Sequence, residues 1–131
     1  MEADLNPLTS TAALAYLGDA VFELRVREML LARDECSASP HALNKQARKY
    51  VSAQAQSAMY HAIFPLLNEH EQSIMKRGRN LHSTSRAKNA DVTAYRHATG
   101  LETLFGYLHE RNDQTRINEL FSVCINHINN A

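Results

Sequence analysis

The sequence predicts an all-α domain of five to seven helices. Apolar residues recur at helical spacing along almost the whole chain, and strand-like alternation is nearly absent. Only three prolines and four glycines are available to interrupt helices. At 131 residues, the chain is expected to form one domain, with no separate module for recognising a substrate.

The N-terminal half is predicted to contain two or three helices. The first begins between Thr9 and Thr11 and runs to about Arg33. Ser39 and Pro40 then form a helix cap followed by a first-turn proline. One or two helices cover residues 40–64, and Pro65 ends or bends that element. The expected core residues of this half are Leu14, Leu17, Val21, Leu24, Met29, Leu43, Ala47, Tyr50, Val51, Met59 and Ile63.

The C-terminal half is predicted to contain three helices separated by polar segments. Asn68 caps a short helix from Glu69 to about Arg77, and a polar loop with the sequence GRNLHSTSRAKNA follows it. The next helix starts at Asn89 or Asp91 and runs to about Glu110. The last helix starts at Asn112 or Asp113, with Leu120, Val123, Cys124 and Ile128 as its core residues.

The neutral net charge conceals an uneven distribution along the chain. Residues 36–90 contain eight Lys and Arg and two acids, a net charge of +6, whereas the remainder contains six Lys and Arg and twelve acids, a net charge of −6. This asymmetry indicates an anionic partner for the basic middle segment.

Several protein classes are disfavoured by the sequence. The acidic, polar N-terminus does not resemble a signal peptide, and no apolar run is long enough to span a bilayer comfortably. Cys36 and Cys124 lack the spacing of metal ligands, which indicates reduced thiols and a cytoplasmic location. No HExxH pair, Gly-rich phosphate loop or GxSxG elbow is present.

Two acids in apolar helical segments are the candidate catalytic residues. Asp19 lies in LAYLGDAVFEL and Glu102 in ATGLETLFGYL. Small residues beside each acid allow the two helices to cross closely, so that both carboxylates reach one ion. Because a charge in apolar surroundings needs compensation, and Mg²⁺ prefers a few carboxylates and several waters, we expect a magnesium site there. Such an ion activates water and neutralises charge on a phosphodiester.

An alternative interpretation of the two acids remains open at this stage. Asp19 and Glu102 could instead cap helices or pair with arginines such as Arg25 or Arg96, because charged residues are rarely buried without a partner. Glu23, one turn after Asp19, is expected to be solvated or paired with Arg27 rather than to assist a metal.

The basic middle segment is a candidate RNA-binding surface. Cations combined with short polar side chains are typical of contacts to phosphate backbones. Few aromatic residues interleave the cations, which disfavours stacking on unpaired bases and favours duplex RNA. The candidate contacts are Lys76, Arg77, Arg79, Asn80, Arg86 and Lys88, with Lys45, Arg48 and Lys49 as secondary candidates.

The motifs of this chain resemble those of the ribonuclease III family. The run from Leu14 to Leu24 resembles the family's catalytic motif. NKQARKYVSAQAQ, KRGRN and KNADVTAYRHATGLETLFGYL resemble segments of its reduced Mini branch, which consists of the nuclease domain alone. By position, Asp19 matches the aspartate of the first motif, and Glu102 matches the glutamate of the second.

The resemblance implies a specific activity. It implies a homodimer that cleaves double-stranded RNA with Mg²⁺, or with Mn²⁺ as a substitute, and leaves 5′-phosphate ends. It also implies the large-subunit (23S) ribosomal RNA precursor as substrate, with a ribosomal protein as a candidate for presenting it. The chain lacks a double-stranded-RNA-binding domain, so recognition is expected to fall to the nuclease domain.

The chain departs from the full-length family pattern at three positions. Acids usual there are replaced by Ala12, Ala15 and Thr99, which leaves the number of metal ions open. A second hypothesis is therefore a catalytically inactive RNA-binding or ribosome-associated protein of the same fold. A third hypothesis is a helical DNA-binding module that is indifferent to metal.

Overall fold

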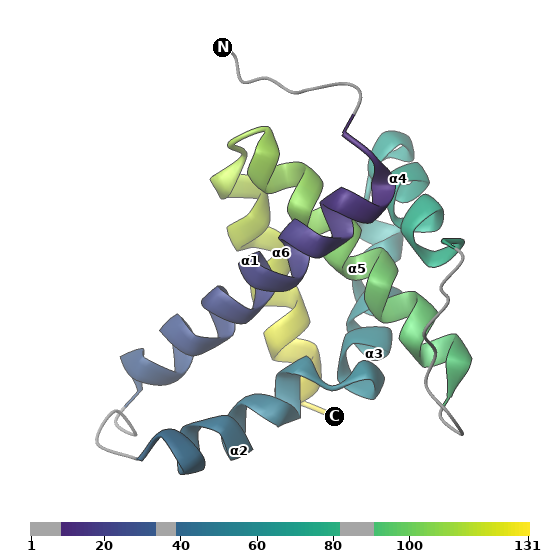
Figure 1. The fold of residues 1–131 in the computed structure, drawn as a ribbon. Helices are drawn as coiled ribbons and strands as arrows, with labels where there is room; N and C mark the ends of the chain where they lie inside the picture. The colour runs from purple at the N-terminus through teal and green to yellow at the C-terminus, as the bar shows by residue number, and fades with distance from the viewer. Residues whose placement is uncertain (1–8, 34–38, 82–90) are drawn as a thin grey trace.

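A computed structural model describes residues 9–33, 39–81 and 91–131. These residues form six α-helices and one 3₁₀ turn, and they contain no strand, which confirms the all-α fold (Figure 1). The elements are α1 (Thr11–Ala32), α2 (Pro40–Val51), α3 (Ala53–Ile63), the 3₁₀ turn (Phe64–Leu66), α4 (Glu69–Arg79), α5 (Val92–Glu110) and α6 (Gln114–Asn129).

Each α-helix begins at a side-chain cap. Serine caps α1, α2 and α3, Asn68 caps α4, and aspartate caps α5 and α6, and in every case the side-chain oxygen accepts a hydrogen bond from a first-turn backbone N–H. At Asn68 the bond is reciprocal, because Glu71 accepts a hydrogen bond from the Asn68 backbone N–H. Ser52 separates the segment 40–64 into two helices, and Pro65 lies in the 3₁₀ turn that follows.

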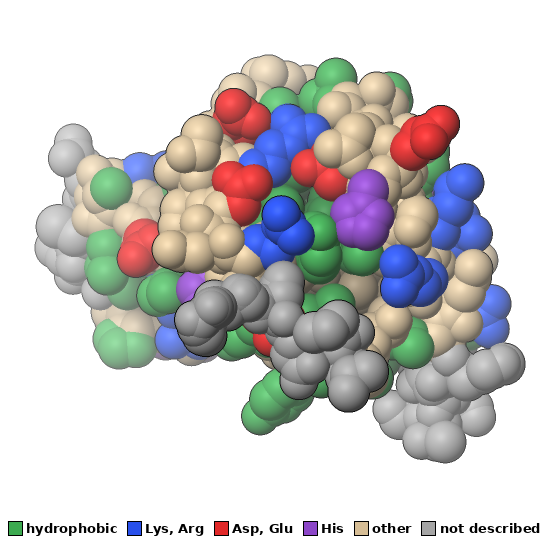
Figure 2. Space-filling view, turned by 90° about the horizontal axis from the view of Figure 1, so that it is seen from above, with side chains coloured by type: hydrophobic (Ala, Val, Ile, Leu, Met, Phe, Trp, Pro, Cys, Tyr) green, Lys and Arg blue, Asp and Glu red, His purple; other side chains and the backbone are tan. Residues whose placement is uncertain are grey.

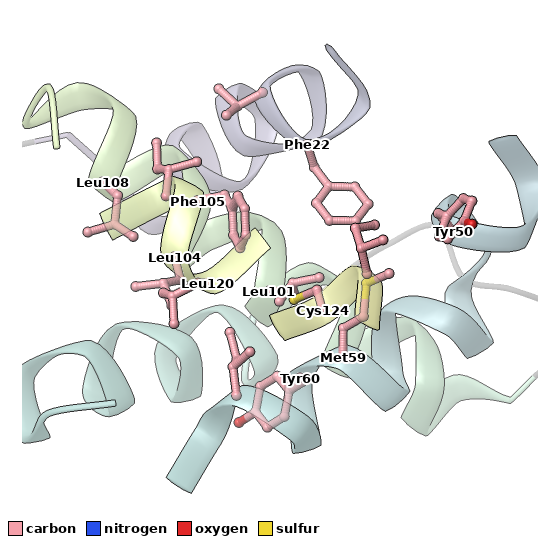
Figure 3. Packing of buried hydrophobic residues seen from close by; sticks show 14 of the residues in the cluster. Phe22, Tyr50, Met59, Tyr60, Leu101, Leu104, Phe105, Leu108, Leu120 and Cys124 are labelled. Carbon is pink, nitrogen blue, oxygen red and sulfur yellow. The ribbon is translucent and has the colours of Figure 1, made fainter. Parts of the chain in front are cut away.

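Helix α5 is the centre of the fold. In Figure 1 it runs diagonally through the molecule, with α1 crossing it on one side and α3 and α4 packed along it. Leu101, Leu104 and Phe105 on α5 are completely buried. Figure 3 shows their neighbours from α1, α3 and α6 packed in the same core. There the Phe22 and Phe105 rings meet edge to face, with their centroids 5.6 Å apart. Helix α5 therefore contacts α1, α3, α4 and α6 and holds them around one core.

All four glycines of the chain lie at the two closest helix crossings on α5. Gly18 of α1 meets the α5 backbone at Gly106, and a Cβ added to Gly18 would lie 1.6 Å from the Glu102 carbonyl oxygen. Gly78 of α4 meets α5 at Gly100, and a Cβ added to Gly78 would lie 2.2 Å from Thr103 Oγ1. The missing side chains let the three helix axes approach more closely than larger residues allow.

Two details of the sequence interpretation are wrong. Leu24, predicted to be a core residue, is 57 % exposed, because it lies on the face of α1 that points away from α5. Helix α4 does not end at Arg77 but continues through Arg79, since Gly78 packs against α5 instead of beginning a loop. No helix in the described part of the chain is both long and apolar enough to cross a membrane.

Candidate active site

The α1–α5 crossing places the two candidate catalytic acids beside one another. Asp19 directly follows Gly18, and the Gly18 backbone packs against the main chain of Glu102. The two carboxyl groups are near enough for the charge on Asp19 to raise the pKa of Glu102. The predicted close crossing of helices with small residues is therefore present, and the glycines are what permit it.

Glu102 is the acid that the fold desolvates. Burial, reinforced by repulsion from Asp19 and to a smaller extent from Glu23, raises the pKa of Glu102 to about 8. Without a cation, this carboxyl group therefore holds its proton at neutral pH. A divalent ion would remove the cause of the shift, because it compensates both burial and repulsion.

Asp19 differs from the sequence interpretation, which placed it in apolar surroundings. The residue is exposed on α1, although partial burial still raises the pKa of its carboxyl group, and Glu23 adds to this shift. The helical run around Asp19 is apolar on the side that faces α5, but Asp19 lies at the edge of that side. Of the two acids, Glu102 therefore carries the larger desolvation penalty and Asp19 is open to solvent and substrate.

Gln56 is a residue of the site that the sequence did not indicate. It lies on α3 and is only 3 % exposed, and its side-chain amide hydrogen-bonds the Glu102 carboxyl, which lowers the pKa of that group. A buried amide needs a partner, and here the partner is the candidate metal ligand. Gln56 thus orients Glu102 from the side opposite α1. A buried glutamine within AQAQ carries no local signal of this role, since only the packing of α3 on α5 creates the contact.

The alternative of ion pairing does not account for these acids. Arg25 donates its hydrogen bonds to Asn118 and Gln114 on α6, and neither acceptor is charged. The ion pairs between described residues include neither Asp19 nor Glu102. Glu23 pairs with Arg27 at 3.5 Å, as expected from their spacing on α1. Among the described residues, no arginine or lysine therefore compensates the two acids at the crossing.

The chemistry of the site fits a hard divalent cation. Within residues 9–33, 39–81 and 91–131, no group of three or more His, Cys, Asp and Glu side chains is arranged to hold an ion. A cation here would have two carboxylates as its protein ligands, and Mg²⁺ accepts such a site because it keeps several waters. The raised pKa of Glu102 shows that burial, and next the charge on Asp19, disfavour its carboxylate form, and a cation would offset both effects.

The three positions where family acids are replaced contribute no carboxylate. Ala12 is exposed, Ala15 is buried, and the Thr99 hydroxyl donates a hydrogen bond to the Tyr95 carbonyl oxygen within α5. These side chains leave Asp19 and Glu102 as the acids at the crossing, with Glu23 further along α1.

The candidate RNA-binding residues separate into two groups. Lys76, Arg77 and Arg79 lie in the last turn of α4, and Asn80 is its C-cap residue. Lys and Arg side chains gather along the right edge of the molecule in Figure 2. This edge is the side on which α4 lies in Figure 1. Arg86 and Lys88 lie outside the described residues.

The second group, Lys45, Arg48 and Lys49, lies on α2 and is exposed. Helix α2 packs on α1, α3 and α6, and Figure 1 shows it at the opposite end of the molecule from α4. Lys45 and Lys49 line a hollow of about 370 Å³ together with Arg33 and Tyr50. The basic middle segment therefore does not form a single surface: its two halves are separated by the core.

Comparisons with known proteins agree with this arrangement. The Ribonuclease III domain family matches residues 12–113. A Mini-ribonuclease 3 of Enterococcus faecalis is 45 % identical over 86 % of each chain. A Mini-ribonuclease 3 of Streptococcus pneumoniae is 42 % identical over 93 % of this chain and 94 % of its own.

A solved structure shows the same fold. An X-ray crystal structure of a protein from Fusobacterium nucleatum superposes with a TM-score of 0.79 at 30 % identity, and covers 92 % of this chain and 94 % of its own. The family match contains both acids, both glycine crossings and Gln56. The chain belongs to the ribonuclease III family, in the branch of the Mini-ribonuclease 3 proteins, and is an endoribonuclease.

Proposed function

We propose that this endoribonuclease cleaves double-stranded RNA in a Mg²⁺-dependent reaction at Asp19 and Glu102. The observation that supports this most directly is the meeting of the two carboxylates at the Gly18–Gly106 crossing, where burial and repulsion leave Glu102 in need of a cation. Membership in the ribonuclease III family and a separate basic edge on α4 agree with a substrate rich in phosphates.

Each residue has a distinct task in this proposal. Glu102 and Asp19 would hold the ion from two helices, and Gln56 would keep the Glu102 carboxylate in one orientation. Bound Mg²⁺ would supply charge neutralisation at the phosphodiester and a more acidic water. Lys76, Arg77 and Arg79 would hold the RNA backbone, with Asn80, Arg86 and Lys88 as further contacts. Lys45, Arg48 and Lys49 would contact the RNA only if it extended from α4 to the opposite end of the molecule, where α2 lies.

The proposal includes a homodimer. Tyr16, Leu24 and Leu31 are 85 %, 57 % and 54 % exposed, and their spacing of eight and seven residues places them on one face of α1. An exposed apolar stripe of this kind is typical of an interface. An apolar hollow of about 320 Å³, lined in part by Leu30, Leu31, Pro40 and Leu43, lies at the other end of α1 from Tyr16. A protruding ring at one end and a hollow at the other fit a two-fold arrangement, in which each surface meets its complement on the second copy.

The natural substrate and location are also part of the proposal. We place the enzyme in the cytoplasm, acting on the 23S ribosomal RNA precursor with a ribosomal protein as a candidate for presenting it. The free thiol of Cys124, which is completely buried, agrees with a reducing compartment.

One assay tests the catalytic part. Duplex RNA is incubated with the protein in the presence and absence of Mg²⁺, with Mn²⁺ as a further arm, and the fragment ends are examined. We expect metal-dependent fragments with 5′-phosphates. The Asp19→Asn variant is expected to bind the RNA and to leave it intact. Wild-type binding without cleavage would favour the catalytically inactive RNA-binding protein, for which the alanines at positions 12 and 15 and the threonine at 99 are the supporting feature.

Oligomeric state is tested separately. Light scattering is expected to give the mass of a dimer for the wild type and of a monomer for Leu24→Glu, because that change puts a charge in the centre of the exposed stripe. A wild type that is monomeric at all concentrations tested would contradict the dimer, while leaving the assignment of the acids intact.

A further inference from the structure

Two histidines, His61 on α3 and His97 on α5, meet on a surface that the nuclease site does not use. Their ring centroids are 4.5 Å apart, with the rings inclined at 60°. The Tyr60 ring lies 4.6 Å from His97, and Ser57 Oγ lies 3.5 Å from His97 Nδ1. His61 is exposed, whereas Ser57 and His97 are half-buried. The pair is therefore open to a ligand on one side and supported by packed groups on the other.

The histidine pair is continuous with the cations of α4. Arg79 Nη1 donates a hydrogen bond to the Tyr60 hydroxyl at 3.5 Å, and its Nε donates to Asn80 Oδ1 at 3.2 Å. Both acceptors are neutral, and none of the ion pairs between described residues involves Arg79. Among the described residues, the guanidinium thus lies beside the two imidazoles and bonds only neutral acceptors.

The same pair is also connected to the catalytic acids through α3. Gln56 contacts Glu102, the next residue, Ser57, contacts His97, and Tyr60 one turn later contacts Arg79. Along this one helix, a series of side-chain contacts, buried at Gln56 and Tyr60, therefore links Glu102 to the histidine pair and to Arg79 at the end of α4.

The local charge decides which ligand the pair takes. Two imidazoles on neighbouring helices are also a geometry for a transition metal, but the guanidinium of Arg79 beside them disfavours a cation and favours an anion. Burial, His61 and Arg79 all lower the pKa of His97, whereas Asp91, the N-cap of α5, and a backbone hydrogen bond at Thr93 raise it. A bound phosphate would oppose the lowering and favour the protonated form of His97.

We propose that Ser57, His61, His97 and Arg79 form a phosphate-binding surface for the duplex RNA and that His97 makes RNA binding stronger at lower pH. This inference rests on the proposed duplex-RNA substrate. It adds Ser57, His61 and His97 to the RNA contacts, and a regulation of affinity that the α4 cations cannot provide, because Lys and Arg remain charged throughout the neutral range. Binding takes up a proton on this surface, so the affinity rises as the pH falls through the imidazole range.

The test is an RNA-binding titration in EDTA, with a labelled duplex RNA, at about pH 6 and about pH 8. EDTA prevents cleavage and removes transition metals, so only direct contacts remain. We expect the wild type to bind more tightly at the lower pH. The double variant His61→Asn, His97→Asn should bind at least about tenfold more weakly than the wild type at about pH 6 and less than about threefold more weakly at about pH 8.

His109→Asn is the matched control, since His109 is an exposed histidine on the same helix, about 18 Å along the axis from His97. It should leave the affinities at both pH values unchanged, so that any loss in the double variant is specific to His61 and His97. The single variant His61→Asn, at an exposed position, keeps the test valid if the double variant melts at a lower temperature.

The outcomes separate the inference from the nuclease proposal. Tight wild-type binding with no difference between the double variant and the wild type overturns the histidine surface and leaves the nuclease proposal standing. A difference that appears only when a transition metal replaces EDTA assigns the pair to a metal and also overturns the phosphate surface. A wild type that neither binds nor cleaves duplex RNA refutes the nuclease proposal and this inference with it.

Discussion

The two glycine crossings on α5 are built alike but carry opposite charges. At Gly18–Gly106, α1 approaches α5 backbone to backbone, and the residues beside the contact are Asp19 and Glu102. At Gly78–Gly100, α4 approaches α5 with Thr103 in the contact, and the residues beside it are Lys76, Arg77 and Arg79. One central helix therefore holds an acidic site on one side and a basic edge on the other.

The two crossings differ in whether their charged side chains are buried or exposed. The α1–α5 crossing buries a carboxyl group and sets a second one against it, so that the pKa of Glu102 rises to about 8. The α4–α5 crossing leaves Lys76 and Arg77 exposed and holds Arg79 through neutral acceptors. At the acidic crossing the charged form of Glu102 is therefore disfavoured, whereas the cations of the basic edge remain open to a ligand. In the proposed nuclease, the first feature would favour a metal ion and the second an RNA backbone.

The largest expected effect comes from adding a methyl group at the acidic crossing. Gly18→Ala places a Cβ 1.6 Å from a backbone carbonyl oxygen that cannot move without displacing α5. We expect a loss of more than about 4 kcal/mol in the free energy of unfolding, measured by denaturant titration. Gly78→Ala meets the Thr103 side chain at 2.2 Å, and should cost about 1–3 kcal/mol.

The exposed residue Ala20, on the same helix as Gly18, provides the control, and Ala20→Ser should change the stability by less than about 0.5 kcal/mol. If Gly18→Ala were no worse than Gly78→Ala, the two crossings would be equally tolerant and the backbone contact would not define the acidic site.

Gln56 tests whether the acidic crossing depends on orientation as well as on charge. Gln56→Leu keeps a buried side chain of similar size but removes the hydrogen bond to Glu102. We expect Mn²⁺ binding, measured by electron paramagnetic resonance without RNA, to weaken by about tenfold or more. The neighbouring exposed residue Gln54 supplies the control variant Gln54→Leu, which should bind Mn²⁺ normally. Equal affinities for the two variants would remove Gln56 from the site.

The pH dependence of the free energy of unfolding should report on the acidic crossing and not on the basic one, and it can be measured without substrate. The folded protein holds the Glu102 proton up to about pH 8, while the unfolded chain releases it near the ordinary value of 4.5. The unfolded state therefore binds fewer protons between these values, and stability falls as the pH rises through this window. Glu102→Gln removes the slope and is expected to be more stable than the wild type by at least about 1 kcal/mol at about pH 8 without metal.

Thermal melting across this window measures the effect. Thr103→Val, at the basic crossing, removes a hydroxyl that donates to the Thr99 carbonyl oxygen, and its change in melting temperature should not vary with pH. Added Mg²⁺ should raise the melting temperature of the wild type more at the upper end of the window, where no proton competes for Glu102. If the stability of Glu102→Gln still fell with rising pH as steeply as that of the wild type, another group would be responsible for the pH dependence.

At the basic edge, we expect a change in RNA binding without a change in stability. Arg77 is exposed and Arg79 half-buried, and replacing both with alanine should weaken duplex-RNA binding by about 1–3 kcal/mol in total, with no change in fold. The plot of log affinity against log salt should also lose about one unit of slope for each phosphate contact removed. Lys45→Ala with Lys49→Ala, on α2 at the other end of the molecule, should have a smaller effect. If the Lys45 and Lys49 variant instead lost more RNA affinity than the Arg77 and Arg79 variant, the RNA would bind on α2.

The local signals in the sequence predict the helices well. The caps at Ser39, Asn68, Asp91 and Asp113 and the turn at Pro65 lie where the residue types indicate, because capping depends only on neighbours within one turn. The two catalytic candidates were also accessible from sequence, since an acid inside an apolar run with small neighbours is unusual. The end of α4 was not, because Gly78 acts through a contact with another helix rather than through its own backbone preference.

What the sequence determined by itself was the all-α fold and the family to which the chain belongs, and it supplied the two acids as candidates for the site. The tertiary structure decided which acid is desolvated, brought Gln56 to Glu102, separated the α2 cations from those of α4, and joined His61 to His97. The physical reason is that helix formation depends on contacts within a few residues. Burial, pKa and charge proximity instead depend on which helices cross and how closely, and here the four glycines set that distance.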